Sequence, residues 1–534
     1  MDLETYENKV EEVLNKGEYR LLSKDPTTTI EGRIYRALKK YSSTLSDAVR
    51  FRLTPHYSKP PHLYGLPKIH KEQMPLRPIT SSRNSPTSEL SKFLLEIIRP
   101  IQGNAASFVR NSAHFVDLLG GIEVETNDRL VSFDVESLYT NVPIGESLNI
   151  IRDKLSKDAA FSTRTTLPLD GVMELLEICL RNSYFQVKDR FYAQDEGLPM
   201  GSSLSPVIAN IFMEWFEEHA IDASRCKPKL WLRYVDDTFI IWDKEEKALQ
   251  EFLLHLNSFR PTIKFTMETE KDSALPFLDV LVKKVGGNLR TSVYRKPTHT
   301  GQYLHYESNH PATTKVGIIR SLYNRARTIC RNDEDLKTEV DTIYKDLQQN
   351  GYPKKLISRT IQRTRPNQIR DEATTTTRLL PIPYIRGTSE QIRRIASKYN
   401  IRTAFRSSTT IRSVVSKTKP DGMVDTKNCV YRIPCECGDS YIGETKRPLE
   451  IRAKEHRSWT QRGEVSKSGI AEHAWHNGHN IHWSEAKILH KEQHWRKRKF
   501  VEAAFISQNQ RIFSQPSVDI PNIWKPLLSG QCRI

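Results

Sequence analysis

The chain has 534 residues, of which 37% are hydrophobic and 9% aromatic, so it can bury real cores and is not disordered throughout. Its 81 Lys and Arg residues outnumber 64 Asp and Glu residues, and the formal charge of +17 favours a polyanionic partner such as nucleic acid; a basic protein without such a partner is an equal alternative. The sequence holds no apolar run near the roughly 18 residues of a membrane span, so we expect no membrane partner.

In chain order, the first 50 residues have apolar residues at helical spacing, and 51–84 are rich in proline and basic residues, which predicts an extended loop. A helix is expected at 88–102 and a strand at 129–139. A helix is expected at 173–185. The segment 197–221 then begins with a Gly/Pro-rich turn and continues as a second helix. The strand RYVDD follows, then a helix at 245–259 and strands at 264–270 and 276–285. This alternation predicts an α/β or α+β protein.

The second half of the chain changes character. Residues 316–370 are helical in pattern and strongly basic, 363–378 read as a linker, and a connector leads to a module rich in Cys, His and Tyr near the C-terminus.

Three carboxylates stand where apolar strands meet turns. Asp134 lies in SFDVESLY, and Asp236 and Asp237 lie in YVDD. Such residues usually cap turns, but two neighbouring strands would bring all three together. Paired divalent cations would then offset the charge and serve an in-line phosphoryl transfer.

YVDD and FDVESLY resemble the two metal-binding strands of reverse transcriptases, and GLPMGSSLSPVIANIFM resembles the turn and helix beside their nucleotide pocket. The segments YGLPKIHK, PLRPITSS, FTMETEKDSALPFLDV and VYRKPTHTGQYLHYESNHP are similar to the reverse transcriptase of Penelope-like retroelements over residues 50–320. The resemblance implies a right-hand polymerase with fingers, palm and a helical thumb.

The resemblance also assigns residues. Asp134 and Asp236 would bridge two Mg²⁺ or Mn²⁺ ions, assisted by Asp237, and Tyr139 would exclude a ribose 2′-OH, with a core tyrosine as the alternative. Arg77 would neutralise the incoming triphosphate, with Lys68 and Lys71 as further candidates. The remaining nucleotide-pocket residues would be Gln194, Gly201, Ser202 and Pro206. Arg295 and Lys296 would touch the primer or template backbone, unless they are a solvated pair.

The tail contains CVYRIPCECGDSYIG followed by a helix-like segment, in which Arg452 and His456 share one face. With Glu502 in a later helix, this order resembles a GIY-YIG endonuclease over residues 428–525, although the first motif here reads CVY. The resemblance implies that Glu502 binds one metal ion, Arg452 stabilises phosphate, and Tyr431 and Tyr441 activate water. His456 is a candidate to share that task, and Asn522 resembles the family's late Asn.

Cys435, Cys437, His473 and His479 are two thiols and two imidazoles, which suit a tetrahedral Zn²⁺ site. The C-x-C spacing is tighter than in usual zinc fingers, but Penelope-type nuclease domains carry a Cys/Cys/His/His site in this place. Cys429 with Cys435 is an alternative thiol pair, and His476 is an alternative ligand.

The sequence therefore predicts an α+β multidomain protein with fingers at 1–110, palm at 111–295, a helical thumb-like region at 296–372, a connector at 373–425 and a GIY-YIG nuclease at 426–534. Its expected function is target-primed insertion: the nuclease nicks DNA, and the polymerase extends the freed 3′-OH with dNTPs along an RNA template. The rivals are a truncated or domesticated non-catalytic nucleic-acid-binding protein and a telomerase-like host enzyme.

Three further expectations concern context. Met1 falls inside a region that family members precede with more sequence, which predicts incomplete fingers. The N-terminal stretch MDLETYENKVEEVLNK lacks a signal-peptide core. Seven cysteines, an odd number, fit an intracellular setting better than a disulfide framework. KPKLWLR and HWRKRKF are candidate nuclear-localisation clusters, so action in the nucleus is expected.

Overall fold

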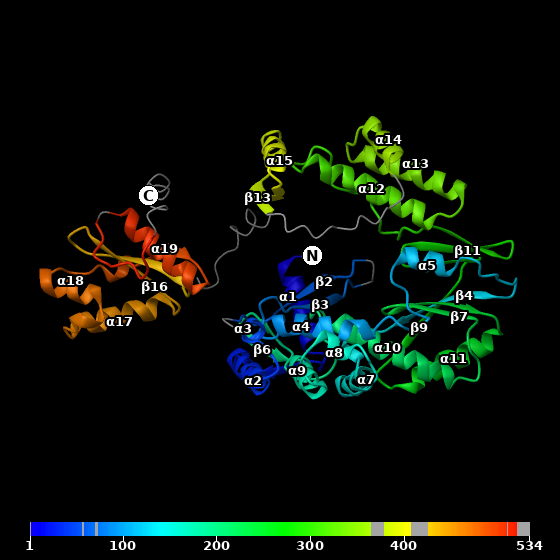
Figure 1. Cartoon of the computed structure of the whole chain (residues 1–534), viewed down its shortest axis with the longest axis horizontal. Helices are drawn as coiled ribbons and strands as arrows, with labels where there is room; N and C mark the ends of the chain where they lie inside the picture. The colour runs from blue at the N-terminus through cyan, green and yellow to red at the C-terminus, as the bar shows by residue number, and fades with distance from the viewer. Residues whose placement is uncertain are drawn as a thin grey trace. The chain divides into compact units, whose positions relative to one another are not determined.

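The computed structural model describes residues 2–55, 58–69, 73–364, 379–406, 426–509 and 511–520 (Figure 1). The chain divides into two compact units, Met1–Arg406 and Ser407–Ile534, at a point inside the connector expected at 373–425. Both contain helices and sheets, so the α+β class is confirmed. Among the described residues, none of the helices has the length and apolarity needed to cross a bilayer.

A four-stranded antiparallel sheet in the order β7-β8-β4-β9 lies within the segment expected as the palm. Its strands are β4 (Arg129–Val135), β7 (Leu230–Tyr234), β8 (Asp237–Trp242) and β9 (Phe265–Thr269). Because successive side chains point to opposite faces, Val131 and Phe133 join one hydrophobic core and Leu130 joins another. Burial on both faces explains why β8 is apolar without alternation.

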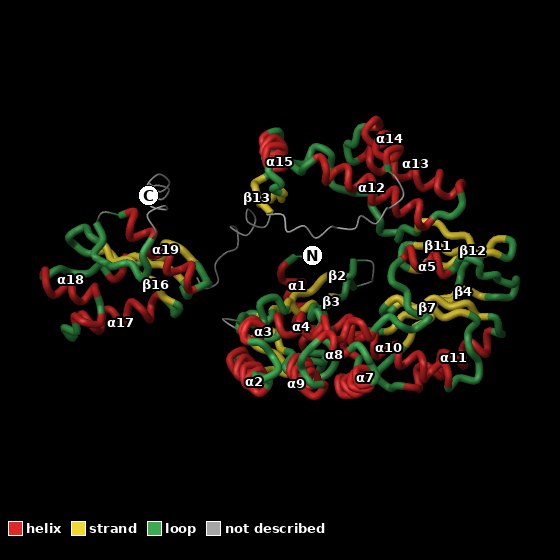
Figure 2. The backbone as a smooth tube through the Cα atoms, viewed as in Figure 1, coloured by secondary structure: helices red, strands yellow, loops and turns green. Residues whose placement is uncertain are grey.

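A group of helices shares the hydrophobic core on one face of this sheet (Figure 2). Their bounds are α4 (Ser88–Ile98), α6 (Leu138–Asn141), α7 (Ile144–Ser156), α8 (Phe161–Arg164), α9 (Leu169–Arg181), α10 (Ser205–Asp222) and α11 (Glu246–Phe259). The opposite face meets α5 (Ser112–Leu118) and a sheet of β10 (Ala274–Phe277), β11 (Val280–Val285) and β12 (Asn288–Val293). There the ring of Phe115 lies 5.1 Å from that of Phe239 and 4.6 Å from that of Phe277.

A second sheet, in the order β1-β6-β5-β2-β3, combines strands from distant parts of the sequence. These are β1 (Arg20–Leu22), β2 (His62–Pro67), β3 (Leu76–Ser81), β5 (Tyr184–Val187) and β6 (Arg190–Ala193), accompanied by α1 (Leu3–Leu14), α2 (Thr27–Lys40) and α3 (Asp47–Leu53). This sheet therefore joins three strands of the segment expected as fingers (1–110) to two strands of the segment expected as palm (111–295).

The extended conformation expected at 51–84 is confirmed, but part of the segment is not a loop, because β2 and β3 pair there as an antiparallel hairpin. Proline suggested a loop there. However, β3 is an edge strand, where the missing N–H of Pro78 costs little.

After β12 the chain runs without helix or strand over 294–311, and three helices follow, α12 (Ala312–Ile329), α13 (Asp333–Gln349) and α14 (Lys354–Arg363), which share a small core. The expected helical character of 316–370 is confirmed over the described part. A short parallel pair, β13 (Leu379–Pro383) and β14 (Arg402–Arg406), flanks α15 (Thr388–Lys398) inside the expected connector.

The second unit contains a three-stranded antiparallel sheet, β16-β15-β17, packed with helices. Its elements are β15 (Cys429–Pro434), β16 (Ser440–Thr445), β17 (Lys487–Lys491), α17 (Leu449–Gln461), α18 (Gly469–Asn477) and α19 (Trp495–Gln508).

Candidate functional site

The three strand-end carboxylates meet at one edge of the central sheet. Asp134 is the register partner of Asp237 in the pairing of β4 with β8. Asp236 lies in the turn between β7 and β8, and its carbonyl accepts a hydrogen bond from the N–H of Val135 at 3.1 Å. The expected side-by-side arrangement of the two strands is therefore confirmed, and all three aspartates line a cavity of about 910 Å³.

The electrostatics of this edge favour a bound cation. Burial, followed by the neighbouring charges of Asp236 and Asp134, raises the pKa of Asp237 to about 6, whereas Lys296 opposes the shift. Like charges gathered in a half-buried site repel one another, and oxygen ligands of this kind suit Mg²⁺ or Mn²⁺. The donor set thus fits divalent metal ions.

One wall of the cavity is built by β3 and by the turn before α10. The N–H of Thr80 donates to the carbonyl of Met200 at 2.7 Å, and the hydroxyl of Ser82 donates to that of Gly201 at 2.9 Å. Gly201 has φ +125°, and a Cβ added there would lie 2.2 Å from the Thr80 oxygen. Only glycine permits this approach, which brings Arg77 of β3 into the same cavity as the aspartates.

The other expected nucleotide-pocket residues mostly line the same cavity, namely Lys68, Tyr139, Ser202 and Pro206. Tyr139 is anchored through its carbonyl, which accepts the N–H of Leu198 at 2.6 Å. Burial, with Asp236 nearby, raises the pKa of its phenol, so the ring stays neutral and presents a rigid face. Lys71 lies outside the described residues.

Two expected site residues, Gln194 and Arg295, do not line the cavity. Gln194 is buried, donates to the carbonyl of Glu196 at 3.1 Å, and is not among the residues that line the cavity, because it follows β6 in the second sheet. Arg295 makes a bidentate ion pair with Glu339 of α13, at 2.5 and 2.6 Å, so its guanidinium ties β12 to the helical region. Lys296, next to it, does line the cavity.

Sequence reasoning missed two basic residues of the cavity wall, Arg83 and Lys92. Lys92 shares a helical face with Ser88 and Ser91, a spacing of i, i+3 and i+4 that a search for a polar helix face would have found. With Lys68, Arg77 and Lys296, five cations surround three carboxylates, a balance that suits a polyphosphate held with metal ions.

In the second unit, the residues expected to act on water also lie together. The Tyr431 hydroxyl lies 2.9 Å from Nε2 of His456, and Nδ1 of His456 lies 2.7 Å from Oγ of Ser468. The rings of Tyr441 and His456 are 5.3 Å apart. Burial, followed by the charge of Arg452, lowers the pKa of His456 to about 3, so the imidazole is neutral.

Arg452 and Glu502 complete this cluster. The Arg452 guanidinium lies 5.3 Å from the Trp459 ring and 3.1 Å from Glu455, and it counteracts the rise in the pKa of Tyr431 that burial causes. Burial also raises the pKa of Glu502, and Oε2 of this side chain has no hydrogen-bond partner in the described part of the chain. An orphaned, buried carboxylate oxygen fits a metal ligand.

Gly443 lets the two tyrosines approach each other. A Cβ at this position would lie 2.7 Å from the Tyr441 ring and 2.8 Å from the Tyr431 hydroxyl. Glycine is needed as the last residue of YIG, because two aromatic rings occupy the space that its side chain would fill.

The four expected zinc ligands converge although they lie up to 44 positions apart. One ligand atom from each of Cys435, Cys437, His473 and His479 lies within 4.8 Å of the others. Sγ of Cys437 is 3.5 Å from Nε2 of His473, which is 3.1 Å from Nδ1 of His479. Tetrahedral Zn²⁺ with S and N ligands needs edges of about 3.3–3.8 Å, so the set fits zinc.

The alternative ligands are not part of this group. The thiol of Cys429 is buried and donates to the carbonyl of Thr426 at 3.2 Å, and His476 is outside the cluster. Asn522 lies outside the described residues.

A comparison with known protein families finds a match that covers the three aspartates of the first site. Residues 69–304 match the family described as reverse transcriptase (RNA-dependent DNA polymerase), so the chain contains a reverse transcriptase domain that includes Asp134, Asp236 and Asp237. Residues 302–362 match the family described as animal helix-turn-helix domain. No curated protein matches the chain.

Solved structures with some similarity include a telomerase from Candida albicans in complex with a TWJ fragment of telomeric RNA, with 10% identity, a TM-score of 0.42, and coverage of 64% of this chain and 62% of that one. Apo telomerase from Candida tropicalis has 12% identity and a TM-score of 0.37, with coverage of 64% and 66%. The BmCPV RNA-dependent RNA polymerase at elongation state has 12% identity and a TM-score of 0.35, with coverage of 64% and 31%. The chain thus spans less than two thirds of the length of these proteins.

Proposed function

We propose that the first unit polymerises DNA on an RNA template by two-metal phosphoryl transfer. The observation that carries this is the register pairing of Asp134 with Asp237, with Asp236 in the adjoining turn, inside a cavity that Arg77 and Lys296 also line. Bound Mg²⁺ or Mn²⁺ would lower the charge on the reacting phosphate and activate the primer 3′-OH.

The chain's own residues would bind the metal ions and the dNTP and orient them. Asp134, Asp236 and Asp237 hold the metal ions, and Arg77 binds the triphosphate of the dNTP through its planar fork of donors. The neutral ring of Tyr139 fills the space that a ribose 2′-OH would need. Gly201 keeps the turn close to β3, so that Ser202 and Pro206 form the floor under the nucleotide.

Primer extension tests this proposal. The full chain, with an RNA template, a DNA primer, dNTPs and Mg²⁺, should extend the primer, and Asp236→Ala should abolish extension. Asp243→Ala is the matched control, because Asp243 directly follows β8 but does not line the cavity. Equal incorporation by the wild type and Asp236→Ala would refute the assignment.

We infer a second activity, metal-dependent DNA nicking of the GIY-YIG type, for the second unit. Supporting it are the contact of Tyr431 with His456, the neighbouring Tyr441 and Arg452, and the buried Oε2 of Glu502, which has no hydrogen-bond partner among the residues that the structure describes. Glu502 would hold one Mg²⁺, Arg452 would bind the scissile phosphate, and a tyrosine would take the proton from water. Glu502→Gln should spare supercoiled plasmid that the wild type nicks, and nicking at an unchanged rate would exclude this site.

The biological setting we propose is a Penelope-like retroelement, acting in the nucleus by target-primed insertion. It is supported by the segments YGLPKIHK and VYRKPTHTGQYLHYESNHP and by the order of polymerase before nuclease. Zn²⁺ at the Cys/His cluster would fix the β15–β16 turn to α18. The charge of +17 would hold RNA and DNA through phosphates, with affinity that falls as salt rises. A domesticated nucleic-acid-binding protein without catalysis is the alternative that the two activity tests decide.

A further inference from the structure

The turn that carries Asp236 and Asp237 has an unusual backbone. Val235 has φ +57°, a left-handed conformation that a β-branched residue rarely adopts. Such a conformation persists only where surrounding contacts impose it. One contact is the hydrogen bond from the N–H of Val135 to the carbonyl of Asp236.

The second contact comes from a fully buried arginine. Nη1 of Arg233 donates to the carbonyl of Val235 at 3.0 Å and to Oδ1 of Asn210 at 3.0 Å, while its Nε donates to Oε1 of Glu217 at 2.5 Å. Arg233 is 0% exposed and Glu217 4% exposed. A lysine ammonium has no such planar fork and cannot reach these acceptors in the same geometry.

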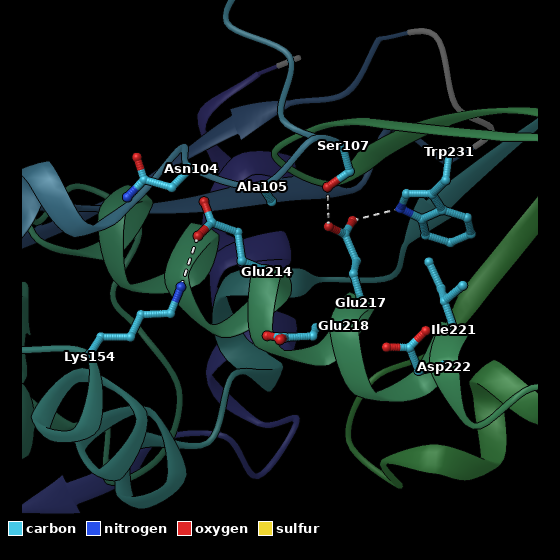
Figure 3. A pocket seen from close by; sticks show the side chains of 10 residues that line it. All are labelled: Asn104, Ala105, Ser107, Lys154, Glu214, Glu217, Glu218, Ile221, Asp222 and Trp231. Carbon is cyan, nitrogen blue, oxygen red and sulfur yellow. Dashed lines mark hydrogen bonds and ion pairs between the residues drawn. The ribbon is translucent and has the colours of Figure 1, made fainter. Parts of the chain in front are cut away.

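Glu217 is itself fixed by donors from other elements. Its Oε1 also accepts the indole N–H of Trp231 at 2.8 Å, and its Oε2 accepts the hydroxyl of Ser107 at 2.8 Å (Figure 3). A buried carboxylate with three donors is held in one rotamer, and it can therefore hold the arginine in place.

Helix α10 connects this network to the nucleotide pocket. Ser205 and Pro206, in its first turn, line the cavity of the aspartates, and Asn210 and Glu217 further along hold Arg233. The same rigid element thus sets both the nucleotide floor and the back of the metal-binding turn.

We propose that Arg233 and Glu217 are positioning residues for polymerisation: their buried ion pair holds Val235 in its left-handed conformation, so that Asp236 and Asp237 face Asp134. This rests on the proposed polymerase function of the first unit. Arg233 does not line the cavity and acts through the metal-binding turn.

The chain offers a matched control on the same helix. Glu214 is also 4% exposed and lines the same cavity of about 470 Å³ as Glu217 (Figure 3). Its carboxylate accepts from the N–H of Gly103 and from Lys154, neither of which belongs to the β7–β8 hairpin. Glu214→Gln therefore disturbs a comparable buried carboxylate without touching the turn.

The test compares full-length Arg233→Lys, Glu217→Gln and Glu214→Gln by primer extension over a range of Mg²⁺ concentrations, with thermal unfolding measured in parallel. We expect Arg233→Lys and Glu217→Gln to lower kcat by about tenfold or more and to raise the Mg²⁺ concentration for half-maximal rate by about tenfold, because small displacements of catalytic groups have effects of this size. For Glu214→Gln, kcat and the Mg²⁺ concentration for half-maximal rate should both stay within about twofold of the wild-type values. This should hold even if its Tm falls as much as the Tm of the other two variants.

A second readout does not depend on activity. Mn²⁺ binding is measured by electron paramagnetic resonance, and the component that disappears in Asp236→Ala is assigned to the polymerase site. Arg233→Lys should weaken that component, and Asn210→Ala, a milder change, should weaken it less. If the wild type extends no primer, the polymerase proposal fails, but this comparison still decides the positioning role.

Wild-type Mg²⁺ dependence in both Arg233→Lys and Glu217→Gln would overturn the proposal. An equal shift in Glu214→Gln would also overturn it, because the effect would then be one of general stability.

Discussion

The hydroxyl of Tyr431 lies 2.9 Å from Nε2 of His456, and both side chains are buried in the second unit. Because burial lowers the pKa of His456 to about 3, below an unfolded-state value near 6.5, the unfolded chain binds one more proton between these two values. The stability that this histidine contributes is therefore complete above about pH 6.5 and is lost as pH falls toward 3.

We therefore predict that His456→Gln flattens the acid side of the stability profile. The slope of unfolding free energy between pH 6 and pH 4 should decrease by up to about 1.4 kcal/mol per pH unit, the contribution of one proton. Calorimetric Tm values of the full chain at a series of pH values measure it. Exposed His494→Gln should leave the slope unchanged, and a wild-type slope in His456→Gln would contradict the prediction.

The contribution of Asp237 to stability should depend on pH in the opposite direction. Burial and two carboxylates raise its pKa from 3.8 to about 6, so the folded chain binds more protons in this window and stability falls as pH rises through it. Without metal, Asp237→Asn should raise the Tm of the first unit by a few degrees at pH 7.5 and by little at pH 4. Added Mg²⁺ should stabilise the wild type more than the variant; a destabilised variant at pH 7.5 without metal would refute this electrostatic account.

Gly201→Ala should lower polymerase activity and stability together. The new Cβ would lie 2.2 Å from the carbonyl oxygen of Thr80, at φ +125°, and relief requires β3 to move away from the turn. A loss of about 1–3 kcal/mol is expected from such backbone strain. Gly317→Ala is the control, because it lies in helix α12 with nothing within 4 Å of the added atom, and it should stabilise by about 0.5–1 kcal/mol.

Tyr139→Ala should relax sugar selection. If the ring fills the space of a ribose 2′-OH, its removal should lower the ratio of kcat/KM for dNTPs over rNTPs by roughly 10–200-fold, whereas Tyr139→Phe should keep it. Single-nucleotide incorporation on an RNA template measures both ratios. An unchanged ratio in the alanine variant would make Tyr139 a packing residue only.

Zinc analysis checks the Cys/His cluster. We expect about one zinc ion per chain by mass spectrometry of the purified protein. Cys437→Ser should lose it, and Cys226→Ser, in the first unit, should retain it. Chelation should lower the Tm of the second unit, since the ion would join residues 435–437 to 473–479. A wild-type chain without zinc that unfolds at the same temperature would exclude the site.

The local pattern of apolar residues and the chemistry of single residues determined many of the strands, helices and candidate metal ligands of this protein. The alternation around Asp134 and the apolar run after Asp237 predicted two strands with a carboxylate at one end, and the helix at 245–259 was confirmed as α11. Side-chain period is a property of neighbouring residues, and turn residues such as Gly201 reveal local conformation. Metal-ligand chemistry can likewise be recognised from residue type, as for Cys435 and His473.

Only the tertiary structure decided which side chains are buried or already paired with other residues of the chain. Arg295 is paired with Glu339 and Gln194 is buried, and neither lines the cavity of the aspartates, which their motifs alone did not reveal. Conversely, Lys92 joins the cavity from a helix more than forty residues before Asp134. Sequence patterns report backbone period and residue chemistry, whereas hydrogen-bond partners, burial and the neighbours of a charge depend on contacts between segments far apart in the chain.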